Sequence, residues 1–168
     1  QQKLRELLEN SSHIVFFGGA GVSTESNIPD FRSEDGLYGS KQAKTNPYPP
    51  ETMLSHSFFK RHTEQFFEYY FDRMVYPQAK PMLPIDGLHQ QAGSKRVYEL
   101  HGSVLRNHCI RCGASYSLEQ MLEYKGKGVP RCSCGGIIKP DVVLYEESLD
   151  SDLLEGAVRY IMAADLLI

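Results

Sequence analysis

Four cysteines are the residues of this 168-residue chain whose spacing most clearly predicts chemistry. They form Cys109-x2-Cys112, a spacer of 19 residues, and Cys132-x-Cys134. Paired thiolates separated by a loop of this size can close a tetrahedral zinc site, and four of them leave no position open for substrate or water. We therefore expect one structural zinc ion. The alternatives are two redox-active pairs or reduced core cysteines, and His108 could replace one thiolate.

A glycine-rich turn follows the apolar run 13–17. This run is short and β-prone, which predicts a buried parallel strand. The turn from Gly18 to Ser23 matches the dinucleotide-binding fingerprint only in part, because Thr24 stands where a third glycine is usual. Glycines let the backbone approach a diphosphate, and a helix N-terminus attracts its charge. A purely structural turn is the alternative.

Residues 28–32 place an acid, an aromatic ring and a cation close after this turn. A hydride-transferring dehydrogenase continues its helix to a second strand, whereas here Pro29 interrupts the helix. We therefore expect the loop to cover a bound nucleotide.

The elements that must position these residues follow from hydrophobic spacing. Leucines at helical spacing predict a helix over 1–10, and aromatic residues over 57–76 predict a helical module with an aromatic core. A strand is expected at 142–145, a helix at 153–164, and the start of another strand at 165–168. Strands alternating with helices predict an α/β fold.

Composition and charge limit the classes of function. The chain has 18 Lys and Arg against 21 Asp and Glu, a net charge of −3, with 41% apolar residues. This balance argues against a dedicated nucleic-acid-binding protein. No apolar run approaches the roughly 20 residues of a membrane helix, and residues 1–6 precede no signal-peptide core. We expect a cytoplasmic protein that does not enter the membrane.

Five motifs in order resemble the signature of the sirtuins, the NAD-dependent protein deacylases. They are Gly19-Ala20-Gly21-Val22-Ser23 with Ile28-Pro29-Asp30-Phe31-Arg32, then Ile85-Asp86-Gly87-Leu88-His89, then Glu99-Leu100-His101-Gly102, the cysteine module, and Lys139-Pro140-Asp141-Val142-Val143. The zinc module and a pI near 6.1 resemble bacterial members. The resemblance implies a Rossmann-like parallel-sheet NAD-binding domain over 1–40, 82–106 and 137–168. It carries a helical module over 41–81 and a zinc-binding module over 107–136.

The resemblance also implies an activity. A sirtuin transfers the acetyl group of acetyl-lysine in a protein substrate to ADP-ribose from NAD, and nicotinamide leaves. His101 matches the general base, a role that suits histidine because its proton equilibrium lies near neutral pH. Phe31 would shield the reactive ribose carbon from water, and Arg32 would meet phosphate charge.

The remaining site residues are also carried over from the resemblance. Those expected to bind the nucleotide are Gly19, Ala20, Gly21, Ser23, Thr24, Asp30, Phe31, Arg32, Ile85 and Asp86, the last two in the pocket for the nicotinamide carboxamide. Val143, Leu144 and Tyr145 match the strand to which a substrate peptide adds by backbone pairing. His89 is expected to be structural.

The chain departs from the family pattern at several positions. Gly18 replaces a threonine and Asn27 a glycine, and both changes look tolerable. The peptide strand ends in Tyr145-Glu146-Glu147 instead of Phe-Gly-Glu, which predicts an altered peptide groove. Members that prefer acidic acyl groups resemble one another in a Tyr-x-x-Arg pair, where this chain has Phe67 and Tyr70. Removal of acetyl or longer neutral acyl groups is therefore expected.

The largest departure is internal. Met82-Leu83-Pro84 stands where the family has a helix and a strand ending in Thr-Gln-Asn, and a parallel crossover needs about a dozen residues. Either the sequence omits residues of a longer molecule, which we favour, or a deletion leaves an inactive fragment that only binds NAD or ADP-ribose. A protein ADP-ribosyltransferase is a further alternative, against which His101 argues.

Overall fold

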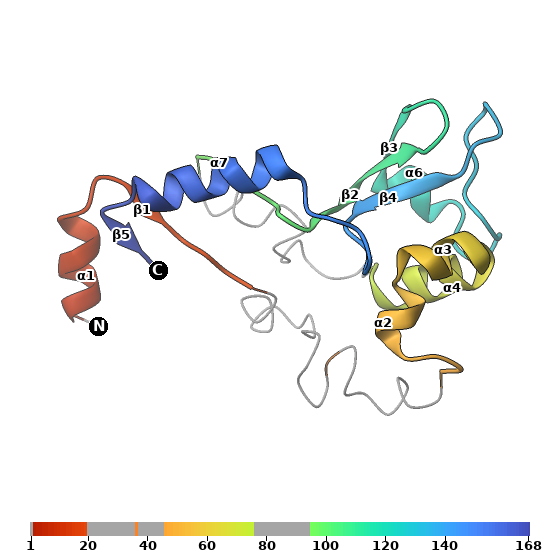
Figure 1. Cartoon of the computed structure of the whole chain (residues 1–168), viewed down its shortest axis with the longest axis horizontal. Helices are drawn as coiled ribbons and strands as arrows, with labels where there is room; N and C mark the ends of the chain where they lie inside the picture. Colours follow the sequence, from red (N-terminus) through yellow and green to blue (C-terminus); the bar gives the residue numbers. More distant parts are fainter. Residues whose placement is uncertain (1, 20–35, 37–45, 76–94) are drawn as a thin grey trace.

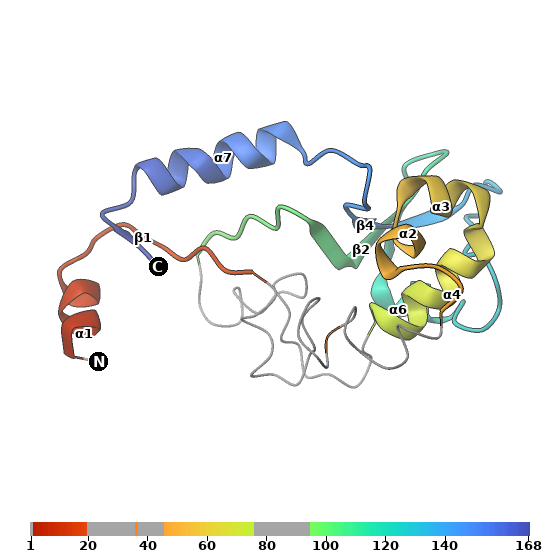
Figure 2. The same cartoon turned by 60° about the horizontal axis from the view of Figure 1, so that its bottom comes forward.

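The computed structural model describes residues 2–19, 36, 46–75 and 95–168 of the chain. Figures 1 and 2 show two groups of elements at opposite ends of these residues, joined by a long helix and an extended segment. One end holds α1 (Gln2–Glu9), β1 (Ile14–Val15) and β5 (Leu166–Leu167). The other holds the short helices α2, α3, α4 and α6 and a three-stranded sheet.

The parallel pairing expected for the first strand is confirmed, because Ile14 lies opposite Leu166 in a parallel register. Asp165 fixes this pairing, since its carboxylate accepts the backbone N–H groups of Ser12 at 2.9 Å and His13 at 3.0 Å. The expected burial of the strand is wrong for the described residues, where Phe17 is 64% exposed. In the described residues β1 pairs with β5 alone, which gives a sheet of two short strands.

The aromatic stretch forms α2 (Pro50–Met53), α3 (His56–Arg61) and α4 (Thr63–Arg73). Ser55 begins α3 by accepting the N–H of Phe58, as expected of an N-cap serine. Phe66 and Phe67 are almost fully buried and meet edge to face at 5.2 Å. The expected helical module with an aromatic core is therefore confirmed, and His62 separates α3 from α4 within it.

The cysteine segment forms an antiparallel sheet with strand order β3-β2-β4, from β2 (Gly102–Cys109), β3 (Ser115–Ser117) and β4 (Ile138–Val142). Helix α6 (Leu118–Leu122) follows β3 through a capping box between Ser117 and Gln120. The buried Met121 and Ile138 belong to the same apolar core as the aromatic helices. One core thus joins the helical module to this sheet.

Helix α7 (Ser151–Met162) begins at Asp150, whose carboxylate accepts the N–H of Leu153 at 2.9 Å. Its buried Gly156 lies against the ring of Tyr98, and a Cβ there would come within 2.8 Å of that ring. The helix therefore supports the extended segment that leads into β2 (Figure 2). Within the described ranges, no helix is long and apolar enough to cross a membrane.

Candidate active site and metal centre

His101 lies in a turn directly before β2, and its side chain is exposed. The turn closes through the N–H of Gly102, which donates to the carbonyl of Glu99 at 2.8 Å. The carbonyl of His101 in turn accepts the N–H of Val143 at 3.0 Å. The histidine turn is thereby attached to the residues that follow β4.

Gly102 allows this attachment through its conformation and its size. Its φ of +77° is in the left-handed region, and a Cβ at this position would lie 1.8 Å from the carbonyl oxygen of Asp141. A side chain at position 102 would therefore separate β2 from β4 where the two strands begin to pair at Gly102 and Val142.

The segment 143–145 corrects one expectation. It is not a continuous strand, because β4 ends at Val142 and only Tyr145 forms a bridge, in parallel with Ser55. Tyr145 donates its N–H to Leu54 at 3.1 Å and accepts the N–H of His56 at 2.9 Å. Tyr145 is therefore bonded to the start of the helical module, whereas Val143 is bonded to His101 before β2.

Glu147 holds the same segment from its other end. Its carboxylate accepts the N–H of Leu144 at 2.9 Å, lies 2.8 Å from Nδ1 of His56, and pairs with Nζ of Lys139 at 3.1 Å. Burial opposes ionisation of Glu147, but these hydrogen bonds and the Lys139 charge outweigh it and hold the pKa of Glu147 below its ordinary value. The ionised carboxylate thus fastens β4, the segment 143–145 and α3 together.

Replacing Glu147 with Gln should lower the free energy of unfolding by about 1–2 kcal/mol at pH 7, with allowance for its partly exposed position. A depressed pKa contributes stability above the unfolded-state pKa of about 4.3, and that stability is lost as pH falls through the folded-state pKa. The difference between Glu147→Gln and the parent should therefore shrink in urea titrations repeated at falling pH. Exposed Glu68→Gln is the control, and a difference independent of pH would contradict the assignment.

Glu146 takes the place where the family pattern has glycine, and its φ is 74°. Its carboxylate accepts the N–H of Ser57 at 2.8 Å and the hydroxyl of Ser57 at 3.0 Å. These two bonds at the start of α3 offset the strain of a left-handed glutamate. Where this chain departs from the family pattern, the structure thus has a carboxylate bound to the start of α3.

The four cysteine sulfurs lie within 4.8 Å of one another, at the ends of β2 and before β4. Sγ of Cys109 is 3.5 Å from that of Cys134, and Sγ of Cys112 is 3.6 Å from that of Cys132. Four thiolates about 2.3 Å from one zinc ion would be separated by roughly 3.8 Å, whereas a disulfide needs about 2.05 Å. The cluster fits a four-thiolate zinc site. Each of the two short Sγ–Sγ distances joins a cysteine of the first motif to a cysteine of the second.

The backbone around the cluster also suits thiolates. The N–H of Arg111 points at Sγ of Cys109 and that of Gly136 at Sγ of Cys134, both at 3.4 Å. A Cβ at Gly136 would come within 2.6 Å of Sγ of Cys109, so only glycine fits there. The hydroxyl of Tyr116 hydrogen-bonds Cys132 and lowers the pKa of that thiol. These donors favour the ionised form that binds metal, although at Cys134 the lowering of the pKa by the Gly136 N–H is outweighed by burial and the neighbouring sulfurs, which raise it.

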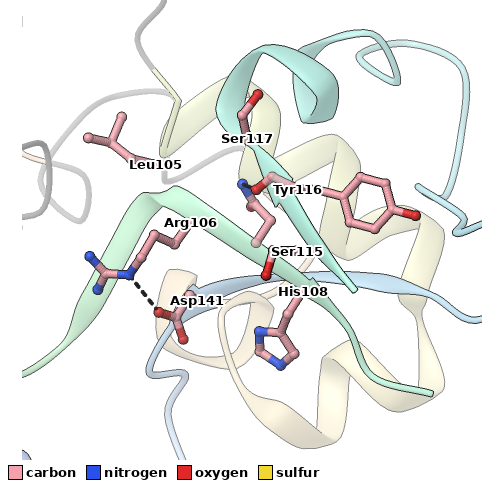
Figure 3. Close-up of a pocket in the computed structure, with 8 residues that line it drawn as sticks. Leu105, Arg106, His108, Ser115, Tyr116, Ser117 and Asp141 are labelled. Atoms are coloured by element: carbon pink, nitrogen blue, oxygen red, sulfur yellow. Dashed lines mark hydrogen bonds and ion pairs between the residues drawn. The ribbon is translucent and has the colours of Figure 1, made fainter. Parts of the chain in front are cut away.

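A pocket of about 420 Å³ opens along the outer face of β2 and β3, close after the histidine turn (Figure 3). Arg106, His108 and Asp141 line it, and the ring of Tyr116 points away from Arg106. The Arg106 guanidinium pairs with Asp141 at 3.1 Å and with Glu99 at 2.5 Å. Glu99 and Asp141 each stand in a sequence motif, but Asp141 is 35 residues from Arg106 and no motif links the three, so the sequence alone does not indicate this ion triad.

The expected nucleotide site falls mostly outside the described residues. Of its members the structure describes only Gly19, which is exposed and has no described atom within 4 Å of a Cβ added there. The others lie outside the described residues: Ala20, Gly21, Ser23, Thr24, Asp30, Phe31, Arg32, Ile85 and Asp86. The structure does bring His101 and the segment 143–145 together, and it gathers the four cysteines.

Comparison with known proteins gives consistent matches along the chain. The Sir2 family model matches residues 19–84 and 83–168. An NAD-dependent protein deacetylase of Clostridium acetobutylicum is 52% identical, with 99% of this chain and 75% of that protein covered. The protein of the same name from Clostridium tetani is 53% identical, with 100% and 75% covered.

Solved structures agree with these matches. One described as the structural basis of sirtuin substrate affinity superposes with a TM-score of 0.84 at 32% identity, covering 99% of this chain and 75% of that one. Another, of Sir2 with a deacetylated p53 peptide and 3′-O-acetyl-ADP-ribose, has a TM-score of 0.81 at 32% identity, covering 99% and 74%.

The comparisons also locate the point at which this chain lacks residues of the family pattern. The two segments matched by the family model meet at residues 83–84, within Met82-Leu83-Pro84. The alignment to the Clostridium acetobutylicum protein runs over 187 positions, more than the 168 residues of this chain. The relative therefore carries residues that this sequence lacks, as the motif spacing predicts. With matched segments on both sides of that point and bacterial relatives near 50% identity, the chain belongs to the Sir2 family.

Proposed function

We propose that this chain is an NAD-dependent protein lysine deacetylase, which transfers the acetyl group of acetyl-lysine to ADP-ribose and releases nicotinamide. The proposal depends above all on the bond between the carbonyl of His101 and the N–H of Val143. This bond places the one motif histidine expected to act as a base beside the segment expected to hold the acetylated peptide. Relatives at about 50% identity carry the name of this activity.

His101 is assigned the general base, which accepts a proton from a ribose hydroxyl of NAD. Its exposed position lets the imidazole reach a substrate. Within the described part of the chain, the imidazole has no hydrogen-bond partner that would hold it away from one. Nucleotide binding is assigned to the glycine turn, the loop 28–32, Ile85 and Asp86, on the sequence motifs alone.

The acetylated peptide is assigned to Val143, Leu144 and Tyr145. Tyr145 is already bonded to Leu54 and His56, and both backbone groups of Leu144 are bonded to Glu147, so a peptide that pairs with this segment would have to replace the contacts between Leu144 and Glu147. The buried Phe67 and Tyr70 offer no cation to an acidic acyl group, and burial raises the pKa of the Tyr70 phenol. Acetyl and other neutral acyl groups are therefore the proposed substrates.

The four cysteines are assigned one structural zinc ion, which would hold the end of β2 against the start of β4. The module boundaries proposed from sequence place this site in residues 107–136, inserted in the nucleotide-binding domain. Thiols that must stay reduced to bind metal suit a reducing compartment, so a cytoplasmic location is proposed.

The test of the proposed function is His101→Ala. Loss of a general base should lower kcat for an acetyl-peptide with NAD by about 10²–10⁴-fold. Affinity for ADP-ribose should stay within about twofold, because the imidazole acts on the reacting ribose and not on the phosphates. His13→Ala, at the far end of the molecule, is the matched control. Full activity of His101→Ala, or a parent with no activity, would overturn the proposal.

A second candidate is a fragment that binds NAD or ADP-ribose without catalysis. The break in the family match at 83–84 favours it, because the family pattern has a helix and a strand at the place of Met82-Leu83-Pro84. The intact mass of the purified protein separates the two. A mass well above 19.0 kDa means that the sequence omits residues, whereas 19.0 kDa favours the fragment.

A further inference from the structure

Arg106 joins two acids, Glu99 and Asp141, and Figure 3 shows its pairing with Asp141. Its Nη1 pairs with Glu99 at 2.5 Å and its Nε with Asp141 at 3.1 Å. The side chain of Glu99 is only 7% exposed, whereas those of Arg106 and Asp141 are 56% and 45% exposed. Two separate nitrogens of one planar guanidinium thus hold one buried and one exposed carboxylate.

The two acids are placed where they can fix the turn. Glu99 begins it, and its carbonyl accepts the N–H of Gly102. Asp141 lies opposite Ser103 in the β2–β4 pairing, two residues before Val143, whose N–H closes on His101. Arg106 therefore links Glu99, which precedes His101, to Asp141, which precedes Val143, on the two sides of the hydrogen bond between His101 and Val143.

A buried carboxylate needs a partner, and Arg106 is the cation that the structure places on Glu99. Burial works against charge on Arg106, but the hydrogen bonds and charges of Glu99 and Asp141 outweigh it and raise the pKa of the guanidinium. A lysine has a single nitrogen and could not span both acids in this geometry. The arrangement is specific for arginine.

We propose that Arg106 is a positioning residue for His101, holding the 99–102 turn against β4 so that the imidazole keeps its place beside the segment 143–145. Its effect on catalysis rests on the proposed deacetylase function. Its effect on the turn itself does not depend on that function.

The experiment measures amide hydrogen exchange and steady-state kinetics in Arg106→Gln, Arg106→Lys and the control Arg61→Gln, whose side chain lies exposed on α3. In Arg106→Gln the Gly102 and Val143 amides should exchange about tenfold faster. The Ile110 amide, bonded to Ile137 in the zinc module, should stay within about twofold. Arg106→Lys should be intermediate, and Arg61→Gln should match the parent.

In the same variants kcat should fall about tenfold in Arg106→Gln while KM for NAD changes less than about twofold, since misplacing the base affects the chemical step and not nucleotide binding. Equal acceleration of the Ile110 amide would mean general loss of stability and would overturn the proposal. Unchanged Gly102 and Val143 exchange would overturn it as well. If the parent shows no deacetylation, the proposed function fails, and the exchange of these two amides alone decides the role of Arg106.

Discussion

Replacing Gly102 with Ala is expected to destabilise the protein by at least about 4 kcal/mol, enough to prevent folding of the sheet in a domain of ordinary stability. The added Cβ would lie 1.8 Å from the Asp141 carbonyl oxygen, and the Asp141 carbonyl carbon would be only 2.8 Å away. Backbone of β4 cannot rotate away as a side chain could, so β2 and β4 must separate where they pair. The loss would also release Val143 from His101. Urea unfolding followed by circular dichroism measures this loss of stability.

Gly126→Ala separates this close approach from backbone strain. Gly126 has a φ of +73°, close to that of Gly102, but nothing lies within 4 Å of its added Cβ. Its substitution should cost only about 1–2 kcal/mol, the strain of a left-handed alanine. Equal losses in the two variants would show that conformation alone, and not the contact with Asp141, makes glycine necessary at position 102.

Replacing Cys132 with Ser should remove the zinc and unfold the sheet half of the molecule. Structural zinc in small modules contributes binding free energies of about 10–16 kcal/mol that are coupled to folding. Cys132 is 6% exposed and lies in the same core cluster as Met121 and Ile138, so the loss would spread into the aromatic helices. Zinc content by mass spectrometry should fall from about one ion per chain to a small fraction of one. Circular dichroism should show the accompanying loss of structure.

Ser133→Ala provides the matched control, because Ser133 lies between the two cysteines of the second motif and supplies no thiolate. It should keep about one zinc per chain and nearly all of the stability of the parent. A parent protein with well under one zinc per chain, or a Cys132→Ser variant that binds zinc as the parent does, would contradict the four-thiolate assignment.

Local patterns predicted much of the fold. Leucine spacing predicted α1, the aromatic stretch predicted the buried core of α3 and α4, and the two cysteine motifs predicted one thiol cluster. Each of these depends on neighbours in the chain or on a residue type with a narrow chemical use. Such signals remain visible in a single sequence.

Features that depend on distant partners were not predictable in this way. Apolar residues at 142–145 favour a strand, but Leu54 and His56 capture Tyr145 and end β4 at Val142. Ile14, Phe16 and Phe17 are exposed although they form an apolar run, because the hydrophobicity of a segment does not determine what covers it. The three members of the Arg106 triad carry no spacing that links them before the sheet brings them together.

The pairing of Glu146 with Ser57 has a consequence for how these two positions change in evolution. A glutamate with positive φ is tolerated because its carboxylate gains the N–H and hydroxyl of Ser57. A single base change converts a glycine codon into a glutamate codon, but the substitution becomes acceptable only if the helix start opposite can bind the new carboxylate. In homologous sequences, glutamate at the position of Glu146 should therefore occur together with serine or threonine at the position of Ser57, whereas glycine should leave that second position free to vary.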